Sequence, residues 1–446
     1  MPAVVELAQM LEARERRALR QQALFQQYGL PLVSFTMNIP GPIKNSPLIR
    51  RGFRLGRELL LGQLDLAKAP IPFSEEWDED TGCVGFYVVD LPPRTLKAIT
   101  CGIEKHSELG RLFDMDVLTP EGEKLDRPVP RRCLICGGPA KACARSRTHS
   151  VPQLQAKTKE LLESALLHHD RDTAAGLAIR ALLYEVCTTP KPGLVDRNNN
   201  GSHRDMDIFT FLDSTSSLWP YFSQCVQAGR TTADQPPHCT LAALRIPGQL
   251  AEASMFAATH GVNTHKGAIY TLGLVCGALG RLDVECWKKP EQVLAQVAAM
   301  TQGTVERELS GLTWETARTS GQKFYLQYGV TGVRGQAEAG FPGVLEHGLP
   351  TLEEGLARGL SLNEAGCAAM LTILAHTVDT NMIARGGYAL QQERAAQLRE
   401  LLARTPYPDR AALEELDQAY IRENLSPGGS ADLLALCYLL HFLKEA

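Results

Sequence analysis

The chain has 446 residues, of which 44% are hydrophobic and 22% are charged, and its formal net charge at pH 7 is −4. A chain of this length can form two or three domains, and its mildly acidic balance excludes a protein built mainly to coat nucleic acid. No window of about eighteen apolar residues predicts a membrane span, and no cleavage-type pattern follows the N-terminal apolar run.

The first third of the chain alternates helical and extended patterns. Apolar spacing predicts helices over residues 3–28 and 47–66, and it predicts strands over residues 31–39, 83–89 and 112–117. A further short helix leads into the last of these strands. Such alternation is typical of an α/β domain.

The strand at residues 112–117 carries Asp114 and Asp116 at positions i and i+2. Side chains alternate between the two faces of a strand, so the apolar neighbours can share the buried face while both carboxylates share the open one. Two adjacent carboxylates repel unless a cation lies between them, and Mg²⁺ is the usual cation beside phosphate groups. A solvated strand edge is the alternative. The preceding Gly110-Arg111 and the following turn at residues 119–122 favour phosphate chemistry.

A basic segment over residues 131–149 contains Cys133, Cys136, Cys143 and His149. Thiolate and imidazole are the ligands that zinc prefers, but the spacing matches none of the common finger patterns closely. We favour reduced structural cysteines and leave zinc open. The other nine of the twelve cysteines are scattered singly, which is typical of a cytosolic protein without a disulfide framework.

Three segments of this first module resemble holo-citrate lyase synthase: residues 32–42, 106–117 and 131–149. The resemblance covers about residues 5–155. It implies transfer of a phosphoribosyl-dephospho-CoA group from its triphosphate precursor to a serine of the citrate lyase acyl carrier protein, with release of pyrophosphate. It also implies a nucleotidyltransferase-like site in which Asp114 and Asp116 hold the metal. Guanidinium groups suit phosphate oxygens, so we expect three arginines to face the triphosphate: Arg111, Arg145 and Arg147.

From about residue 153 the pattern becomes helical, with polar, glycine-rich loops. The border falls within residues 149–157, which predicts one domain over residues 1–155 and a nearly all-α domain over 156–446. Residues 1–150 carry a net charge of about +3 and the remainder about −7. The expected helices of the second domain are 161–186, 240–259, 266–280, 291–310, 314–327, 351–358, 363–385 and 431–443.

Polar loops interrupt these helices at several places. Two prolines stiffen the loop that holds Lys191, and polar side chains continue it over residues 198–207. The segment 261–267 runs into an apolar helix that Asn263 or Thr264 can cap, which leaves Lys266 near an anion. This is not a Walker A loop, because its lysine precedes the glycine. Surface loops and helix caps, including Ser430 as the cap of the last helix, are the alternatives.

Four motifs in these loops resemble triphosphoribosyl-dephospho-CoA synthase over about residues 170–446: T-P-K-P-G-L-V-D, N-T-H-K-G, V-D-T-N and S-P-G-G-S-A-D. The resemblance implies that ATP and 3′-dephospho-CoA are joined through a ribosyl bond and that adenine is expelled. Gln336 stands where the resemblance leads us to expect glutamate, so we assign that position no acid or base role.

In such a reaction positive charge develops on the ribose, so a nearby carboxylate stabilises it while a base takes the proton of the attacking hydroxyl. The candidates for these roles are His203, Asp205, Asp207 and Asp379. The triphosphate, bridged by Mg²⁺, would meet Lys191, His265, Lys266 and Arg385.

The sequence therefore predicts a bifunctional transferase, with an N-terminal α/β nucleotidyltransferase-like domain followed by a mostly all-α domain. Its expected partners are ATP, 3′-dephospho-CoA and the apo acyl carrier protein. One rival is a zinc-containing RNA-binding or RNA-modifying protein, which the acidic second half argues against. A second rival is a general Mg²⁺-dependent nucleotide kinase or hydrolase, which would release ADP rather than adenine.

Overall fold

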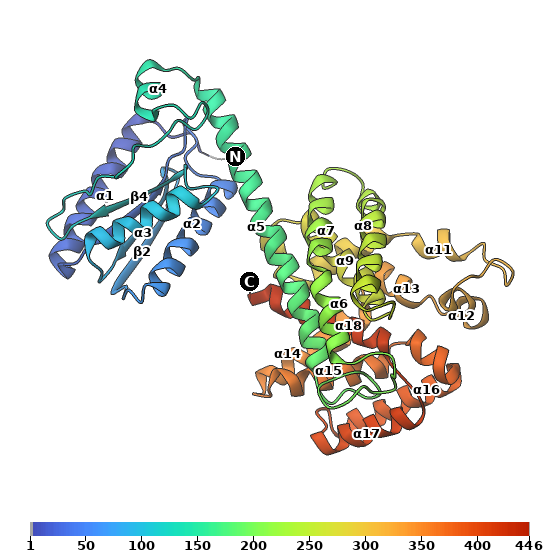
Figure 1. The fold of residues 1–446 in the computed structure, drawn as a ribbon. Helices are drawn as coiled ribbons and strands as arrows, with labels where there is room; N and C mark the ends of the chain where they lie inside the picture. Colours follow the sequence, from blue (N-terminus) through green and yellow to red (C-terminus); the bar gives the residue numbers. More distant parts are fainter. Residues whose placement is uncertain (1–2, 446) are drawn as a thin grey trace. The chain divides into compact units, whose positions relative to one another are not determined.

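The computed structural model describes residues 3–445 and divides the chain into two compact units, one up to His169 and one from Asp170 (Figure 1). The border between the units falls inside helix α5 (Val151–Cys187). The polar stretch at residues 149–157 is the beginning of this helix. The predicted border between one domain over residues 1–155 and a second over residues 156–446 stays a prediction.

The first unit contains a sheet of four antiparallel strands in the order β2-β3-β1-β4. The strands are β1 (Leu32–Met37), β2 (Phe73–Glu79), β3 (Gly82–Val88) and β4 (Phe113–Leu118). Helices and strands therefore occur together as predicted, but the sheet is antiparallel. The edge strand β2 was not predicted. It alternates half-buried and exposed positions and carries four acidic residues, which is how edge strands avoid pairing with other chains.

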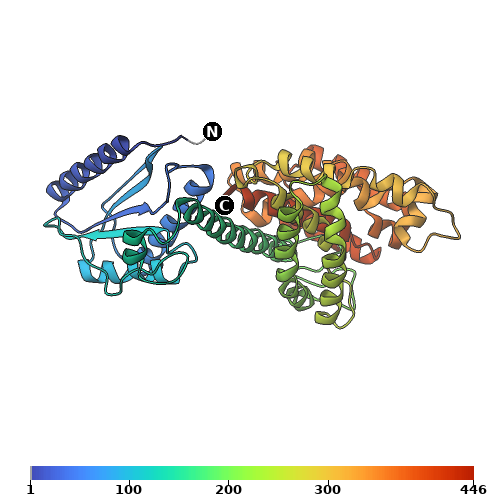
Figure 2. The same ribbon diagram turned by 90° about the horizontal axis from the view of Figure 1, so that it is seen from above.

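Helices cover both faces of this sheet. Helix α1 (Leu7–Tyr28) packs Leu24 against one face, and Figure 2 shows it on that side of the sheet. Helices α2 (Pro47–Leu66) and α3 (Pro93–His106) pack on the other face around Phe35 and Phe113. In β4 the side chains of Phe113, Met115 and Val117 are buried, and Asp114 and Asp116 alternate with them as predicted. The short helix α4 (Ala140–Ser146) follows Cys133 and Cys136, which are called the cysteine pair below.

The second unit is mostly helical, as predicted, and two apolar helices form its centre. These are α9 (Lys266–Arg281) and α18 (Gly428–Glu445), in which most side chains are buried. The other α-helices are α6 (Ile208–Ser217), α7 (Trp219–Thr231), α8 (Pro237–Ala258), α10 (Pro290–Thr301), α11 (Thr304–Leu309), α12 (Ser320–Tyr328), α13 (Gly332–Glu338), α14 (Leu349–Ala357), α15 (Leu362–His376), α16 (Thr380–Arg404) and α17 (Arg410–Arg422).

Several helix boundaries differ from the predicted ones. The helix predicted over residues 363–385 is broken after His376, and Asp379 begins a new helix, α16. The helix predicted over 291–310 divides at Gly303, whose φ is 71°. The helix predicted over 314–327 begins only at Ser320, and helices α6, α7, α13 and α17 were not predicted. In the first two cases the hydrophobic pattern continues across a local break in the backbone. A prediction from periodicity alone therefore joins two separate helices into one.

Between residues 3 and 445, no single helix is long and apolar enough to cross a membrane. Helices α15 and α16 reach that length and apolar composition only together, and the pair is bent by 54°.

The close approach of α2 to the sheet depends on Gly56. A Cβ atom at this position would lie 2.5 Å from Phe35 and 2.8 Å from Phe113, whereas a Cβ at Gly62 of the same helix would meet nothing within 4 Å. We expect Gly56→Ala to lower the free energy of unfolding by about 1–3 kcal/mol, because overpacking forces the helix away from the sheet. Gly62→Ala should raise it by about 0.5–1 kcal/mol.

Chemical denaturation of the full chain measures both variants under the same conditions. Equal effects of the two substitutions would contradict this account of α2.

Candidate functional site

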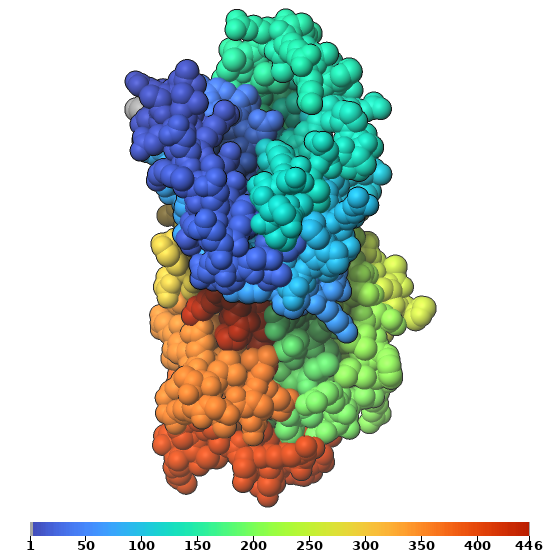
Figure 3. All heavy atoms as spheres, turned by 90° about the vertical axis from the view of Figure 1, so that its left-hand side faces the viewer, coloured from blue at the N-terminus to red at the C-terminus, as the bar shows by residue number. Residues whose placement is uncertain are grey.

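The first site lies on the face of the sheet that α1 covers. Asp114 and Asp116 on β4 stand opposite Thr36 and Ser34 on β1. Beside Asp116 is a cavity of about 160 Å³, and it is rich in cations. Its polar lining residues are Arg14, Arg17, Gln21, Ser34, Thr36, Asp116 and Lys124. Figure 3 shows α1 in dark blue next to the turquoise segment that follows β4.

Arginine and lysine side chains already surround the two carboxylates. Asp114 Oδ1 accepts hydrogen bonds from Arg127 at 2.9 Å and from Arg131 at 3.1 Å, and Asp116 Oδ2 accepts one from Lys124 at 2.5 Å. Burial raises the pKa of Asp114, and the neighbouring Asp116 raises it further. The other oxygen of Asp116 is buried and has no protein partner. This oxygen therefore fits a ligand for a divalent cation.

Glu104 at the end of α3 was not predicted, yet it organises this site. Its carboxylate forms ion pairs with both Arg127 and Arg131, and it accepts the backbone N–H of Met115 at 2.8 Å. One buried carboxylate thus holds two guanidinium groups beside Asp114 and fixes β4 between its two aspartates. Sequence patterns do not reveal this role, because a glutamate near a helix end is ordinarily solvated.

The three arginines predicted to face the triphosphate do not line this cavity. Arg111 donates to the backbone carbonyl of Arg132, and burial lowers the pKa of its guanidinium. Arg145 and Arg147 are exposed at the end of α4. The cations at the cavity are instead Arg14 and Arg17 of α1, together with Lys124.

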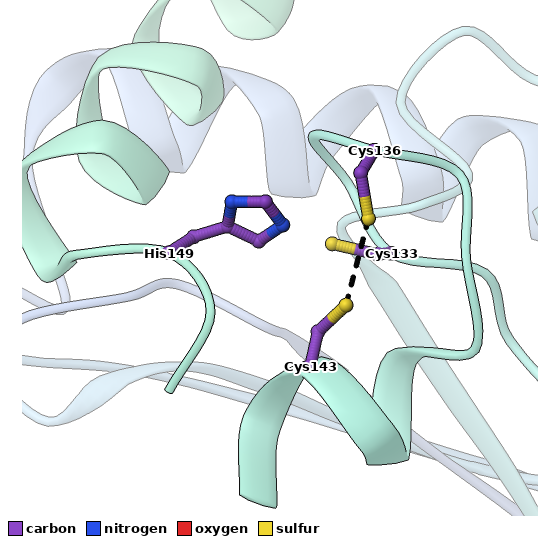
Figure 4. A group of neighbouring side chains, drawn as sticks. All are labelled: Cys133, Cys136, Cys143 and His149. Carbon is purple, nitrogen blue, oxygen red and sulfur yellow. Dashed lines mark hydrogen bonds between the residues drawn. The ribbon is translucent and has the colours of Figure 1, made fainter. Parts of the chain in front are cut away.

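The cysteine segment forms a compact cluster. One ligand atom from each of Cys133, Cys136, Cys143 and His149 lies within 4.8 Å of the others (Figure 4). The backbone amides of Ile135 and Cys136 point at the Cys133 sulfur and lower the pKa of that thiol to about 6.

The second unit contains a larger cavity, of about 490 Å³. Seven residues predicted for the site line it: Lys191, His203, Asp205, His265, Lys266, Asp379 and Arg385. Polar residues without a predicted catalytic or substrate-binding role also line it, among them Glu185, Asn263, Gln336, Ser430 and Asp432. The four motifs, which are far apart in the sequence, therefore meet at one cavity.

Asp207 does not line this cavity. It is the N-cap of α6, where its carboxylate accepts the backbone N–H of Thr210 at 2.9 Å, and this hydrogen bond lowers its pKa. Its position immediately before a helix, with Thr210 three residues later, is the capping-box pattern. Asp207 therefore caps α6 at a position outside the residues that line the cavity.

Lys191 and Glu185 form a buried ion pair at the base of the cavity. The side chain of Lys191 is only 1% exposed, and its ammonium group donates to the carboxylate of Glu185 and to the Glu185 backbone carbonyl at 2.7 Å. Burial raises the pKa of Glu185, whereas the ammonium group opposes that change. Lys191 is thus held in place by Glu185 rather than free to follow a substrate.

Asp379 joins the N-terminal ends of α16 and α18. It caps α16 by accepting the backbone N–H groups of Asn381 and Met382, and it accepts both the N–H and the hydroxyl of Ser430, at 2.7 and 2.9 Å. Ser430 is therefore not the cap of the last helix, since α18 already begins at Gly428. Burial raises the pKa of Asp379, and these hydrogen bonds lower it.

Asp432 is a third carboxylate of the cavity, next to the glycine of the N-T-H-K-G motif. Burial raises its pKa well above the ordinary value, and the charges of Glu185 and Asp379 raise it further. Its partner is the backbone N–H of Ala268 in the first turn of α9. A Cβ at Gly267 would lie 1.9 Å from this carboxylate, which explains the glycine of the N-T-H-K-G motif.

Two histidines face the cavity in different ways. His203 shares a hydrogen bond with Ser426 at 2.7 Å and lies 3.3 Å from Arg385, and burial lowers its pKa. His265 shares a hydrogen bond with Ser214 at 2.7 Å, and burial lowers its pKa to about 3. The other ring nitrogen of His265 has no protein partner. Lys266 forms an ion pair with Glu252 at 2.8 Å.

Comparison with known proteins assigns both units. Residues 5–165 match the family of apo-citrate lyase phosphoribosyl-dephospho-CoA transferases, CitX. Residues 171–446 match the family of ATP:dephospho-CoA triphosphoribosyl transferases, CitG. The chain belongs to the CitXG family. It is thus a transferase of citrate lyase prosthetic group biosynthesis.

Individual relatives agree with this assignment. The chain is 37% identical to Protein CitXG of Haemophilus influenzae, with 97% of this chain and 95% of the relative covered. It is 32% identical to Protein CitXG of Leuconostoc mesenteroides, with 98% and 97% covered. It is 45% identical to the 2-(5''-triphosphoribosyl)-3'-dephosphocoenzyme-A synthase of Pectobacterium atrosepticum, which matches 58% of this chain and 86% of that protein.

The buried His265 predicts how stability changes with pH. Its folded-state pKa of about 3 lies below the ordinary value of 6.5, so the unfolded chain binds a proton that the folded chain excludes between these values. Stability should therefore fall as pH falls from about 6.5 towards 3. His265→Asn should lose less stability than the unaltered chain between about pH 7 and pH 5, measured by thermal unfolding. Parallel losses in the two proteins would contradict this.

Proposed function

We propose that the cavity of the second unit joins ATP to 3′-dephospho-CoA and releases adenine. The observation that carries this proposal is the meeting of four separated motifs at one cavity, which is lined both by cationic groups and by three carboxyl groups whose pKa values are raised. A volume of about 490 Å³ lies within the range of small-molecule sites.

In this reaction the 2′-hydroxyl oxygen of dephospho-CoA bonds to C1′ of the ATP ribose, and the bond from C1′ to the adenine nitrogen breaks. The hydroxyl proton passes to a base, and adenine takes up a proton as it leaves. A carboxylate with a raised pKa is suited to accept a proton near neutral pH. Among the carboxylates of the cavity, Asp432 has a raised pKa and lies near the backbone N–H of Ala268, whereas Asp379 is occupied by four donors.

The triphosphate of ATP requires cations and amide donors. Lys266 and Arg385 line the cavity, and the N-terminus of α9 adds backbone N–H groups. Gln336 contributes a buried side-chain oxygen that has no partner within the protein. We assign Lys191 to positioning Glu185, because its charge is already paired.

We further propose that the first unit transfers the product to a serine of the apo acyl carrier protein, in a nucleotidyltransferase-like reaction. The serine oxygen bonds to the phosphorus nearest the ribose, the bond to pyrophosphate breaks, and the serine proton passes to a base. Arg14, Arg17 and Lys124 supply positive charge for the polyphosphate. Asp114 and Asp116 would hold Mg²⁺, which neutralises polyphosphate charge when bound.

The two reactions should be separable by one substitution. Asp114→Asn should abolish modification of the carrier protein and leave adenine release from ATP intact, because the proposed sites use different residues. The assay combines the full chain with ATP, Mg²⁺, dephospho-CoA and apo carrier, and it measures adenine by chromatography and carrier mass by mass spectrometry. Asp90→Asn, which alters an exposed aspartate of the same unit, is the control.

Loss of both activities in a folded Asp114→Asn protein would refute independent sites. Release of ADP instead of adenine by the unaltered chain would support a kinase and overturn the proposal for the second unit.

Three aspartates near the second cavity differ in their expected importance. Asp432→Asn should lower the rate of adenine release by about 10²–10⁴-fold, the usual effect of removing a general base. Asp205→Asn should have a smaller effect, because the side chain of Asp205 is 65% exposed. Asp207→Asn, which alters a helix cap outside the cavity, should leave the rate unchanged. A larger loss in Asp205→Asn than in Asp432→Asn would assign the base to Asp205.

A further inference from the structure

We propose that Cys133, Cys136, Cys143 and His149 bind one zinc ion in a tetrahedral site that holds the arginine-bearing segment of the first unit in place. Figure 4 shows the imidazole ring of His149 directed at the three sulfur atoms. Its Nε2 atom is buried and has no hydrogen-bond partner, so one coordination position is already aimed at the cluster. Three thiolates and one imidazole are an established structural ligand set for zinc.

The distances within the cluster fit a bound metal better than a disulfide. The sulfur atoms of Cys136 and Cys143 lie 3.5 Å apart. Zinc–sulfur bonds of about 2.3 Å at tetrahedral angles separate two sulfur ligands by about 3.8 Å, whereas a disulfide requires about 2.0 Å. All four ligand atoms lie within 4.8 Å of one another, so small shifts of side chains would complete the coordination sphere.

The backbone around the cysteine pair is shaped to present both sulfur atoms on one side. Cys133 N–H donates to the carbonyl of Gly138 at 2.6 Å, and Gly137 turns the chain with a φ of 69°. The amides of Ile135 and Cys136 then point at the Cys133 sulfur. Backbone amides around a ligand atom fix its orientation.

The other two proposed ligands, Cys143 and His149, lie on either side of a second turn. Cys143 lies in α4, and Arg147 adopts a left-handed conformation with a φ of 48° that returns the chain to His149 just before α5. Three thiolates around Zn²⁺ leave a net charge of about −1. Exposed cations of the same segment complement this charge: Arg132, Lys141, Arg145 and Arg147. The cluster thus accounts for arginines that do not line the cavity beside Asp116.

The proposed zinc site is continuous with the candidate transferase site. Arg131, two residues before the first cysteine, forms ion pairs with Glu104 and Asp114, and the carbonyl of Arg132 accepts a hydrogen bond from Arg111. Tying residues 133–149 into one closed loop would therefore restrict the position of Arg131. This second part of the inference rests on the proposed transfer of the prosthetic group by the first unit, whereas zinc binding itself does not.

The test measures metal in the full chain. Purified without chelators, the protein should contain one zinc ion per chain, as measured by inductively coupled plasma mass spectrometry. When Co²⁺ replaces zinc, the protein should show the visible absorption bands of tetrahedral thiolate coordination. Cys143→Ser and His149→Ala should lose both signals, and His149→Cys should keep them, because thiolate can replace imidazole. Cys239→Ser, which alters a cysteine outside the cluster, is the matched control.

Activity assays separate this inference from the proposed function. In Cys143→Ser we expect carrier modification to fall at least tenfold while adenine release is unchanged. If the unaltered chain binds one equivalent of zinc but carrier modification is unchanged in Cys143→Ser, the metal site is supported and its link to Arg131 is overturned. Iron in place of zinc, a disulfide between cluster cysteines, or failure of added zinc to bind in competition with a chromophoric chelator would overturn the metal site itself.

Discussion

Charged groups that are removed from water must find partners within the protein, and both candidate sites of this chain are built on that requirement. In the first unit, Glu104 holds two arginines, and the same arginines hold Asp114. In the second unit, Glu185 holds Lys191, and Asp379 collects four donors from two helices. These contacts fix the backbone from which the cavities are formed.

Because so many charges are committed to one another, few polar atoms in the cavities stay without partners. Within residues 3–445 these include one oxygen of Asp116, the side-chain oxygen of Gln336 and one ring nitrogen of His265. Each lines a cavity. A polar atom that is buried without a hydrogen bond costs free energy in the folded chain, and a substrate or cation that binds there removes this cost. The charged groups that are paired with one another position the site, and the buried polar atoms without protein partners are the ones that can bind a ligand.

The periodic spacing of apolar residues predicted the helices and strands that bury one apolar face. Strands β1, β3 and β4 and helix α2 were predicted close to their observed bounds. Strand β2 was missed, because an edge strand with charged residues lacks an apolar face. The break before Asp379 was missed because apolar residues continue through it. The spacing of Asp207 to Thr210 marks the helix cap that the structure contains.

The sequence by itself determined the two families, the motifs and most of the residues that line the larger cavity, because motif residues are recognisable without their positions. Only the tertiary structure decided that Asp432 lies beside Glu185 and Asp379, that Glu104 supports Asp114, and that three cysteines and a histidine converge. These relations join residues separated along the chain by helices and turns. Their pKa values and pairings depend on distance and burial, which no local pattern encodes.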